Sequence, residues 1–175
     1  NGFFDCLRVL RYVDLSIILA QQLGSKLRSQ IGDVHVDWVI ASPMAGITFG
    51  SNVAKALGAT SMFFTEKDPA VKGGMIWNRM QIPEGETVLQ IEELITTSKT
   101  LNAVKTAVDE GNKAPVNWLP VIGSLVHRPE KLVDEYAGRK VISLIEKEVW
   151  NKPQDECPLC KAGSKRYKPK VDGNW

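Results

Sequence analysis

Cysteine is scarce in this sequence, and long hydrophobic runs are absent. The three cysteines, Cys6, Cys157 and Cys160, are an odd number that forms no disulfide framework and favours a reducing, cytoplasmic setting. No apolar run approaches the roughly 20 residues that span a bilayer, so we expect no membrane partner. A strong charge of either sign is also missing. The net charge of +2 argues against a dedicated nucleic-acid-binding protein, which usually carries a strongly basic face.

The sequence has the composition of an ordinary globular domain. Its 175 residues are 43% hydrophobic and 24% charged, enough to bury one core. Apolar residues at helical spacing alternate with short, mostly apolar segments. The helical segments are 14–32, 47–58 and 100–111. Asp14 is the expected cap of the first segment, and Gly58 is the expected end of the second. The strand-like segments are 34–41, 60–64, 75–82, one that begins at Val88, 116–128 and 140–150.

Strands that alternate with helices predict an α/β fold with a mainly parallel, twisted sheet flanked by helices. Pro120 lies inside one predicted strand, where proline predicts a bulge or an edge position. In parallel sheets, ligands bind beyond the carboxyl ends of the strands. Two loops, 42–46 and 92–100, follow such ends. We therefore expect them to form one site.

The second loop has the residues of a phosphate cradle. Backbone N–H groups at the start of the predicted helix favour an anion, and hydroxyls and one lysine add donors and charge. Glu92 and Glu93 would repel a phosphate at contact distance, so sugar hydroxyls or hydrated Mg²⁺ suit them better. Helix capping and a solvated acidic rim are the alternative interpretation. The cradle residues are Thr96, Thr97, Ser98, Lys99 and Thr100.

The motif "VLQIEELITTSKT" resembles the phosphoribosyl-pyrophosphate (PRPP) motif of type I phosphoribosyltransferases: an apolar strand, two acids, two apolar residues and a Thr-rich loop. The segments "VDWVIASPMAGITFGSNVAKALG" and "FFTEKD" resemble the preceding parts of that fold. "WNRMQIPEGETVLQIEE" and "SLVHRPE" resemble the orotate phosphoribosyltransferase branch. The match covers roughly residues 36–145. The tail "ECPLCKAGSKRYKPK" looks like one found in some proteins of that branch.

The resemblance implies roles for the two acids and the loops. Glu92 and Glu93 would hold the ribose hydroxyls, directly or through Mg²⁺, and residues 96–100 would hold the 5′-phosphate. Arg128, with Thr96, would contact the base. Lys67 would meet the pyrophosphate, and Lys72 would lie in a mobile loop hinged at Gly73 and Gly74. The pyrophosphate loop would comprise Ser42, Met44, Ala45 and Gly46.

The sequence departs from the family pattern at the centre of the motif. Glu93 stands where Asp is common, and Ser98 and Lys99 stand where Gly is common. If that backbone requires a positive φ, Ser98 costs on the order of 1 kcal/mol. The mobile loop is short, and Glu66 replaces a basic residue found in some members.

The resemblance implies a Mg²⁺-dependent transfer of phosphoribosyl from PRPP to a nucleobase, orotate first, by a cytoplasmic homodimer that binds neither nucleic acid nor membrane. The alternatives are a non-catalytic sensor of PRPP or a nucleotide, and a transferase for another base. We expect a domain over residues 1–150, with a partial hood near 1–32, and a tail over 151–175. The CxxC of Cys157 and Cys160, and the distant His35 and His127, define no metal site by themselves.

Overall fold

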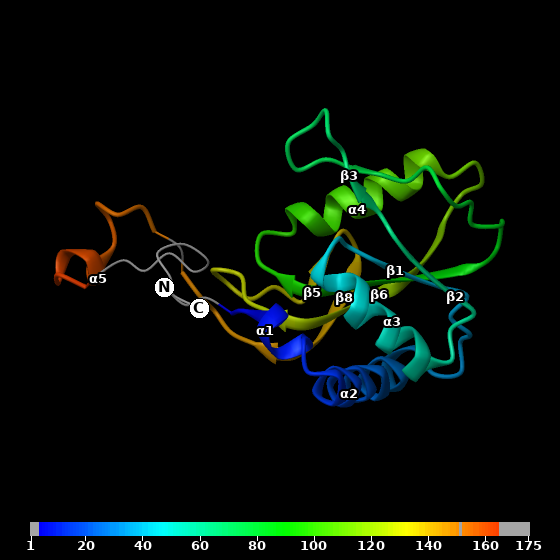
Figure 1. Ribbon diagram of the computed structural model, residues 1–175, viewed down its shortest axis with the longest axis horizontal. Coiled ribbons are helices and arrows are strands. Elements are labelled where there is room, and N and C mark those ends of the chain that lie inside the picture. The colour runs from blue at the N-terminus through cyan, green and yellow to red at the C-terminus, as the bar shows by residue number, and fades with distance from the viewer. Residues whose placement is uncertain (1–3, 151, 165–175) are drawn as a thin grey trace.

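A computed structural model describes residues 4–150 and 152–164 of the chain. A six-stranded sheet lies at its centre in the order β2-β1-β5-β6-β8-β7 (Figure 1). All neighbouring strands run parallel except β7 and β8, which are antiparallel. The prediction of an α/β fold with a mainly parallel sheet is confirmed. The strands of this sheet are β1 (Trp38–Ala41), β2 (Ser61–Phe64), β5 (Thr87–Ile95), β6 (Asn117–His127), β7 (Glu135–Tyr136) and β8 (Arg139–Glu146).

Helices cover both faces of the sheet. Helices α2 (Val13–Ile31) and α3 (Ala45–Leu57) pack on one face, and α4 (Lys99–Gly111) lies on the other (Figure 1). Side chains alternate between the faces along a strand. Thus Leu89 and Ile91 of β5 join the core under α2 and α3, whereas Val88 joins the core under α4. The two cores bury the apolar surface that stabilises the sheet.

The proline in β6 is accommodated by an irregularity in an interior strand. Val88 pairs with Trp118 and Gln90 pairs with Ile122, so β6 contains two extra residues between these pairs. Pro120 lies among those extra residues and is exposed. A bulge leaves residues outside the hydrogen-bond ladder, where proline loses no bond. The predicted bulge is therefore confirmed, whereas the alternative of an edge strand is wrong because β6 lies between β5 and β8.

Some element boundaries differ from prediction. Helix α2 begins one residue before Asp14, and Tyr12 occupies the cap position without a side-chain hydrogen bond, so the assignment of Asp14 as the cap was wrong. The predicted strand 34–41 is regular only over Trp38–Ala41. The predicted strand 75–82 is reduced to β4 (Met75–Ile76), which pairs with β3 (Glu66–Lys67) in a separate hairpin. Gly58 does end α3, in the left-handed conformation.

Two short helices complete the described chain. Helix α1 (Cys6–Leu10) precedes α2 and packs against α2 and α3, and α5 (Pro158–Lys161) lies in the tail. In Figure 1 the tail with α5 extends away from the sheet. Among the described residues, no helix combines the length and apolar character needed to cross a bilayer.

Candidate functional site

The two predicted segments 42–46 and 92–100 meet where β1 ends beside β5, which continues to Ile95. These strands pair in parallel, with Ala41 opposite Ile91, so the next residues of both strands share one edge. There the Ser42 hydroxyl donates a hydrogen bond to Oε2 of Glu92. This contact brings the segments 42–46 and 92–100 together, and their role as one ligand site stays a prediction.

The adjacent acids Glu92 and Glu93 point to opposite faces of β5. Glu92 lies on the α4 side, where its Oε1 accepts a hydrogen bond from Gln90 Nε2 at 3.0 Å. Glu93 lies on the α3 side, where a Cβ placed on Gly46 would come 3.4 Å from its Oε2. Strand geometry causes this separation, because successive side chains alternate. The two carboxylates therefore approach a ligand at the strand end from different sides.

Burial changes the protonation of both acids. The pKa of Glu92 is raised from 4.5 to about 7, chiefly because burial penalises the charged form. Hydrogen bonds from Ser42 and Gln90 oppose that rise. The pKa of Glu93 is also raised by burial, but Glu93 is less buried than Glu92.

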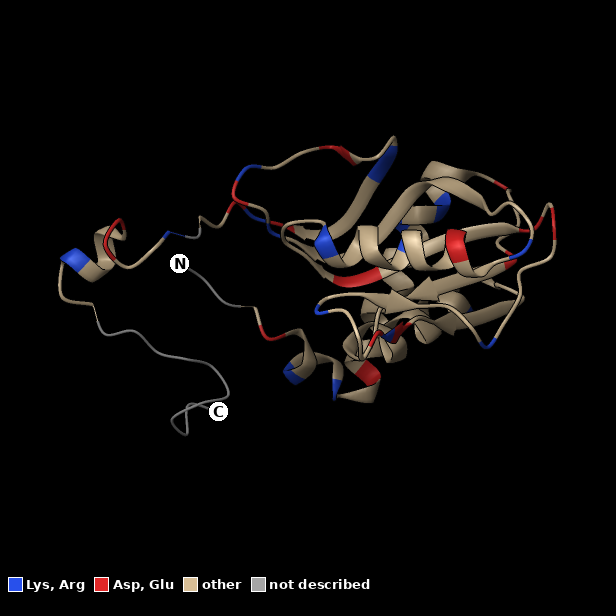
Figure 2. Cartoon of the chain, turned by 90° about the horizontal axis from the view of Figure 1, so that it is seen from above, with Lys and Arg blue, Asp and Glu red and all other residues tan. Residues whose placement is uncertain are grey.

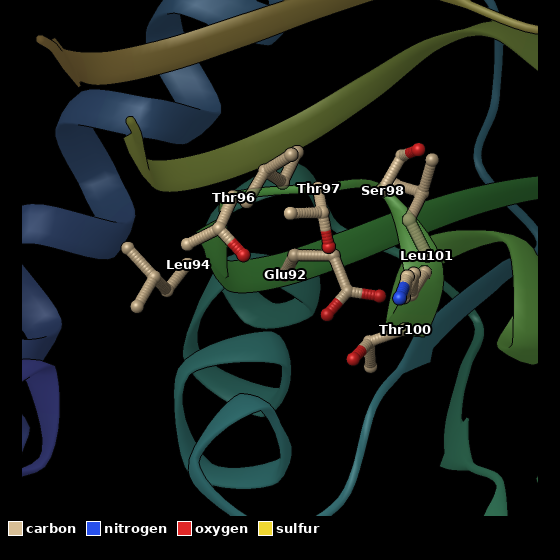
Figure 3. A pocket seen from close by; sticks show the side chains of 9 residues that line it. Glu92, Leu94, Thr96, Thr97, Ser98, Thr100 and Leu101 are labelled. Carbon is tan, nitrogen blue, oxygen red and sulfur yellow. The ribbon is translucent and has the colours of Figure 1, made fainter. Parts of the chain in front are cut away.

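The loop after β5 surrounds a small cavity of about 30 Å³. Figure 3 shows Glu92, Thr96, Thr97 and Thr100 around this cavity. Because about 10–15 Å³ holds one water, the cavity suits a group of a few atoms such as a phosphate and not a whole nucleotide. Helix α4 begins at Lys99, so its first backbone N–H groups belong to this loop. The cavity is lined by Glu92, Leu94, Ile95, Thr96, Thr97, Ser98, Lys99, Thr100 and Leu101.

Ser98 has a left-handed backbone, with φ of 57°. This conformation favours glycine, because a Cβ is crowded there. The sequence predicted a strain cost at Ser98 if its backbone had a positive φ, and the structure shows a positive φ there. Ser98 is the residue before α4, so the strained backbone bends the chain from the loop into the helix. No side-chain hydrogen bond caps the helix there, so Ser98 does not serve as an ordinary N-cap.

The first loop brings a second helix start to the same edge. Helix α3 begins at Ala45, so the predicted loop 42–46 is a loop only up to Met44, and Ala45 and Gly46 are buried in the first turn of the helix. A Cβ on Gly46 would lie 3.1 Å from Ser42 Oγ, so glycine allows the helix to pass close to Ser42 and Glu93. Met44 is 75% exposed, and the peptide bond between Pro43 and Met44 is cis.

The two predicted lysines lie on the β3–β4 hairpin. Lys67 ends β3, and Lys72 lies in the turn, where Gly73 adopts φ of 82°. Both lysines are exposed, and Figure 1 shows the turn projecting from the body of the molecule. An ion pair of 2.8 Å between Glu66 and Arg79 holds the base of the hairpin. The hairpin therefore presents two cations away from the sheet edge.

Arg128 follows β6 at the same edge of the sheet. Its backbone N–H donates to the carbonyl of Ile95 at 2.8 Å, directly before the phosphate-cradle loop. Arg128 is half-buried, and its charge acts on the Cys6 thiol of α1. That thiol donates to the Glu93 carbonyl at 3.6 Å. Helix α1 thus covers the region between Glu93 and Arg128.

Four further residues near the site were given no role by the sequence. His127 is buried, its Nε2 lies 3.1 Å from the Tyr136 hydroxyl, and burial lowers its pKa. Gln90 and Arg139 are buried and hydrogen-bonded to each other. Only Gln90 carried a signal in the sequence, as the one polar residue interrupting the apolar start of its strand. Tyr136 and Arg139 pair with each other across β7 and β8, and β8 lies beside β6, which pairs with β5.

The described part of the chain has neither a ready-made metal site nor a broad region of one charge. Within residues 4–150 and 152–164, no group of three or more His, Cys, Asp or Glu side chains could hold a metal ion. Lys and Arg are interspersed with Asp and Glu along the chain (Figure 2). A bound phosphate would therefore be recognised by local donors more than by a broad positive field. A cation would need ligands from a bound substrate in addition to a carboxylate.

Solved structures with the same arrangement are phosphoribosyltransferases. An adenine phosphoribosyltransferase from Thermoanaerobacter pseudethanolicus aligns with a TM-score of 0.59 at 20% identity, over 82% of this chain and 87% of that one. The UMP synthase of Leishmania donovani aligns with a TM-score of 0.58 at 16% identity, over 82% of this chain and 30% of that one. The fold is that of the type I phosphoribosyltransferases, as the motifs predicted.

Curated relatives narrow the class further. The orotate phosphoribosyltransferase of Heliobacterium modesticaldum is 32% identical over 170 residues, which are 97% of this chain and 83% of that protein. That of Pelotomaculum thermopropionicum is 32% identical over 97% of this chain and 82% of its own length. No family model matches the chain. The chain belongs to the orotate phosphoribosyltransferase family.

Proposed function

We propose that this chain transfers the phosphoribosyl group of PRPP to orotate and releases pyrophosphate. The family relationship over 97% of the chain carries this proposal, and the convergence of the loops at one sheet edge supports it. A ring nitrogen of the base bonds to C1 of the ribose as the bond from C1 to pyrophosphate breaks, and the bonding electron pair leaves with pyrophosphate. The transition state has oxocarbenium character. The protein therefore positions the reactants and stabilises charge, and it needs no side-chain nucleophile.

The phosphate and ribose of PRPP would occupy the loop after β5. The cavity at the start of α4 accepts the 5′-phosphate through backbone N–H groups and the hydroxyls of Thr96, Thr97 and Thr100. Lys99 supplies a positive charge, and Ser98 sets the bend of the loop. Glu92 lines the same cavity, so it accepts a ribose hydroxyl beside the phosphate.

The pyrophosphate would lie over the loop before α3. The Ser42 hydroxyl is already engaged by Glu92, so residues 42–46 contribute mainly backbone N–H groups and the close approach allowed by Gly46. Met44 is exposed at the mouth of this loop. Lys67 and Lys72 reach the pyrophosphate when the β3–β4 hairpin closes over the site. Closure also excludes water from the oxocarbenium ion.

Mg²⁺ suits the donors at this edge. It commonly binds through one or two carboxylates together with substrate phosphates and water. Glu93 fits this role, because its carboxylate is less buried than that of Glu92 and faces the start of α3. Bound there, Mg²⁺ would neutralise the pyrophosphate leaving group.

Orotate would lie between Arg128 and the ribose. It carries a carboxylate, which a guanidinium recognises with two hydrogen bonds. Arg128 is placed at the end of β6 beside Ile95, next to Thr96. We place the partial hood within residues 1–32, where helix α1 lies, and the expected tail over 151–175 is described for residues 152–164. We infer a cytoplasmic homodimer.

Pyrophosphate release tests the proposed function directly. The protein is mixed with PRPP and Mg²⁺ and with orotate, uracil, adenine, hypoxanthine or guanine in turn. Release with orotate alone is expected. Release with another base would overturn the assignment of orotate. Binding of PRPP with no release from any base would instead support a sensing protein.

Variants test the site residues. Glu92→Ala and Glu93→Ala should each abolish release, because each removes a ribose or Mg²⁺ ligand, whereas Glu84→Ala in an exposed turn should leave it unchanged. Lys72→Ala should lower kcat with little change in folding.

Removal of Mg²⁺ with EDTA should stop release, and excess Mg²⁺ should restore it. Unchanged turnover by both glutamate variants would reject this site.

A further inference from the structure

Gln90 is a polar side chain at the centre of an otherwise apolar part of β5. It is fully buried, at 0% exposure, and its amide makes three hydrogen bonds. Nε2 donates to Oε1 of Glu92 and to the carbonyl of Leu101, each at 3.0 Å. Its Oε1 accepts from Nη1 of Arg139 at 2.9 Å. One amide group therefore connects an acid of the site, the first turn of α4 and a buried cation.

Arg139 is an unusual component of this core. It is only 4% exposed, and its guanidinium lies over the Trp118 ring at 5.2 Å. Its Nε and Nη2 are buried and have no hydrogen-bond partner in the structure. A buried cation is costly unless carboxylates or hydrogen bonds compensate it. The carboxylates that act on Arg139 are those of Asp109 and Glu92. The negative charge of Glu92 therefore compensates part of the cost of burying the Arg139 guanidinium.

The carboxylate of Glu92 is held at both oxygens. Ser42 bonds Oε2 from β1, and Gln90 bonds Oε1 from within β5. Two bonds from different directions restrict rotation of the carboxylate. The remaining donor of Gln90 holds the carbonyl of Leu101, and Leu101 itself lines the cavity of the phosphate cradle. The Gln90 amide therefore holds the Glu92 carboxylate and the first turn of α4 in a fixed relative position.

An ordinary core would not require this arrangement. Two apolar residues flank Gln90 in the sheet. Ile40 of β1 pairs with it on one side, and Ile122 of β6 pairs with it on the other. An apolar side chain would pack between them without a buried amide or a buried guanidinium. The polar group is explained if the orientation of Glu92 matters to the site.

We propose that Gln90, supported by Arg139, is a positioning residue that orients Glu92 toward the ribose of PRPP. This inference rests on the proposed function. Neither residue touches the substrate: both act through Glu92. A misplacement of a reacting or binding group by about 1 Å can lower a rate about 100-fold. Loss of the amide should therefore reduce turnover without affecting the orotate subsite.

Steady-state kinetics of Gln90→Met and Arg139→Met test the inference. Gln90→Met is expected to lower kcat about 10- to 100-fold and to leave the KM for orotate within about twofold. Arg139→Met should produce a smaller loss, and Arg139→Lys should recover part of it. The control is Ile91→Val, which changes a buried residue of β5 on the opposite face and should keep kcat. Thermal unfolding is measured for every variant, so that loss of folded protein is not counted as loss of turnover.

The outcomes separate this inference from the proposed function. If the unmodified chain releases no pyrophosphate with any base, the proposed function and the inference both fail. If it turns over and folded Gln90→Met keeps its kcat, only the positioning role is overturned. If Gln90→Met does not fold, Arg139→Met decides: a lower kcat in folded protein supports the role, and an unchanged kcat overturns it. Non-additive losses in the double variant would support one shared path through Glu92, whereas additive losses would contradict it.

Discussion

At the scale of single residues, burial and backbone conformation have the largest consequences at Glu92 and Ser98. Glu92 has a pKa raised to about 7, so it changes charge near neutral pH, whereas an exposed glutamate would be ionised throughout this range. Ser98 carries a Cβ in a conformation that favours glycine. Both features lie in the loop region that we assign to PRPP. Each therefore gives a prediction that can be tested without substrate.

Glu92 should make the stability of the fold dependent on pH. Because its folded pKa exceeds the unfolded value of 4.5, its protonated form contributes stability that is fully present below about pH 4.5 and is lost as pH rises through about 7. The loss should approach about 3 kcal/mol. Glu92→Gln, which cannot ionise, should remove this part of the dependence. Urea unfolding of both proteins at pH 5, 6, 7 and 8 measures it, and parallel pH curves for the two would contradict the expectation.

Ser98→Gly should raise the free energy of unfolding by up to about 1 kcal/mol. Glycine relieves the left-handed strain, and its greater freedom in the unfolded chain offsets part of the gain. Ser25→Gly, at an exposed position inside α2, is the matched control and should lower stability by about 0.5–1 kcal/mol. Urea unfolding compares the two. Destabilisation of similar size at both positions would show that Ser98 is not strained.

At the scale of elements, the C-terminal end of α4 anchors the chain between β4 and β5. The Asn112 side chain pairs with both backbone polar groups of Ile82: its Oδ1 accepts from the N–H at 2.7 Å, and its Nδ2 donates to the carbonyl at 3.0 Å. Gly111 passes so close to Trp77 that an added Cβ would lie 2.2 Å from the Trp77 carbonyl oxygen. These contacts fix the segment that leads from the hairpin into β5, and hence the base of the proposed mobile loop.

Gly111→Ala should lower the free energy of unfolding by about 1–3 kcal/mol, because the new methyl group forces helix and segment apart. Glu110→Ala, at the exposed neighbouring position of α4, should change it by less than about 0.5 kcal/mol. Thermal or urea unfolding measures both. Equal stability of Gly111→Ala and the unmodified chain would mean that the close approach to Trp77 is relaxed in solution.

At the scale of the whole molecule, the short helix α1 lies beside the subsite that we propose for the base. Helix α1 has five residues, and its contact with the site runs through Cys6 and the Glu93 carbonyl. Lys72 is exposed on the turn between β3 and β4. These two features accord with the homodimer inferred from the family resemblance.

The chain should therefore sediment at twice the mass of its 19.4 kDa monomer at micromolar concentration. Mixing folded Lys72→Ala with folded Glu93→Ala then tests whether one site combines Lys72 of one subunit with Glu93 of the other. Recovered turnover in the mixture would show that Lys72 acts on the partner's site. A monomeric species with full turnover would rule out the dimer as the active form.

Much of the site was predictable because its residues are contiguous in sequence. The loop 96–100 and the acids before it lie on one strand and one turn, and local physics indicates a phosphate cradle there. That segments 42–46 and 92–100 lie near each other also followed, since carboxyl ends of parallel strands share an edge, but the hydrogen bond from Ser42 to Glu92 is a finding of the structure. The strand 75–82 was overpredicted, because its apolar residues pack against α4 and only two of them pair in a strand. The alternation that separates Glu92 from Glu93 follows from strand geometry but was not drawn from the sequence.

The sequence by itself determined the α/β class, the family and the position of the loop that we propose for the phosphate, because periodicity and contiguous motifs encode them locally. Only the tertiary structure decided which groups surround Glu92. Gln90 is two residues away, but Arg139 lies 49 positions from Gln90 and reaches it through the pairing of β6 with β8. Burial, which sets the charge of Glu92, is likewise a property of the packed sheet and helices. Residue order alone specifies neither long-range pairing nor desolvation, and these two effects control the chemistry of the site.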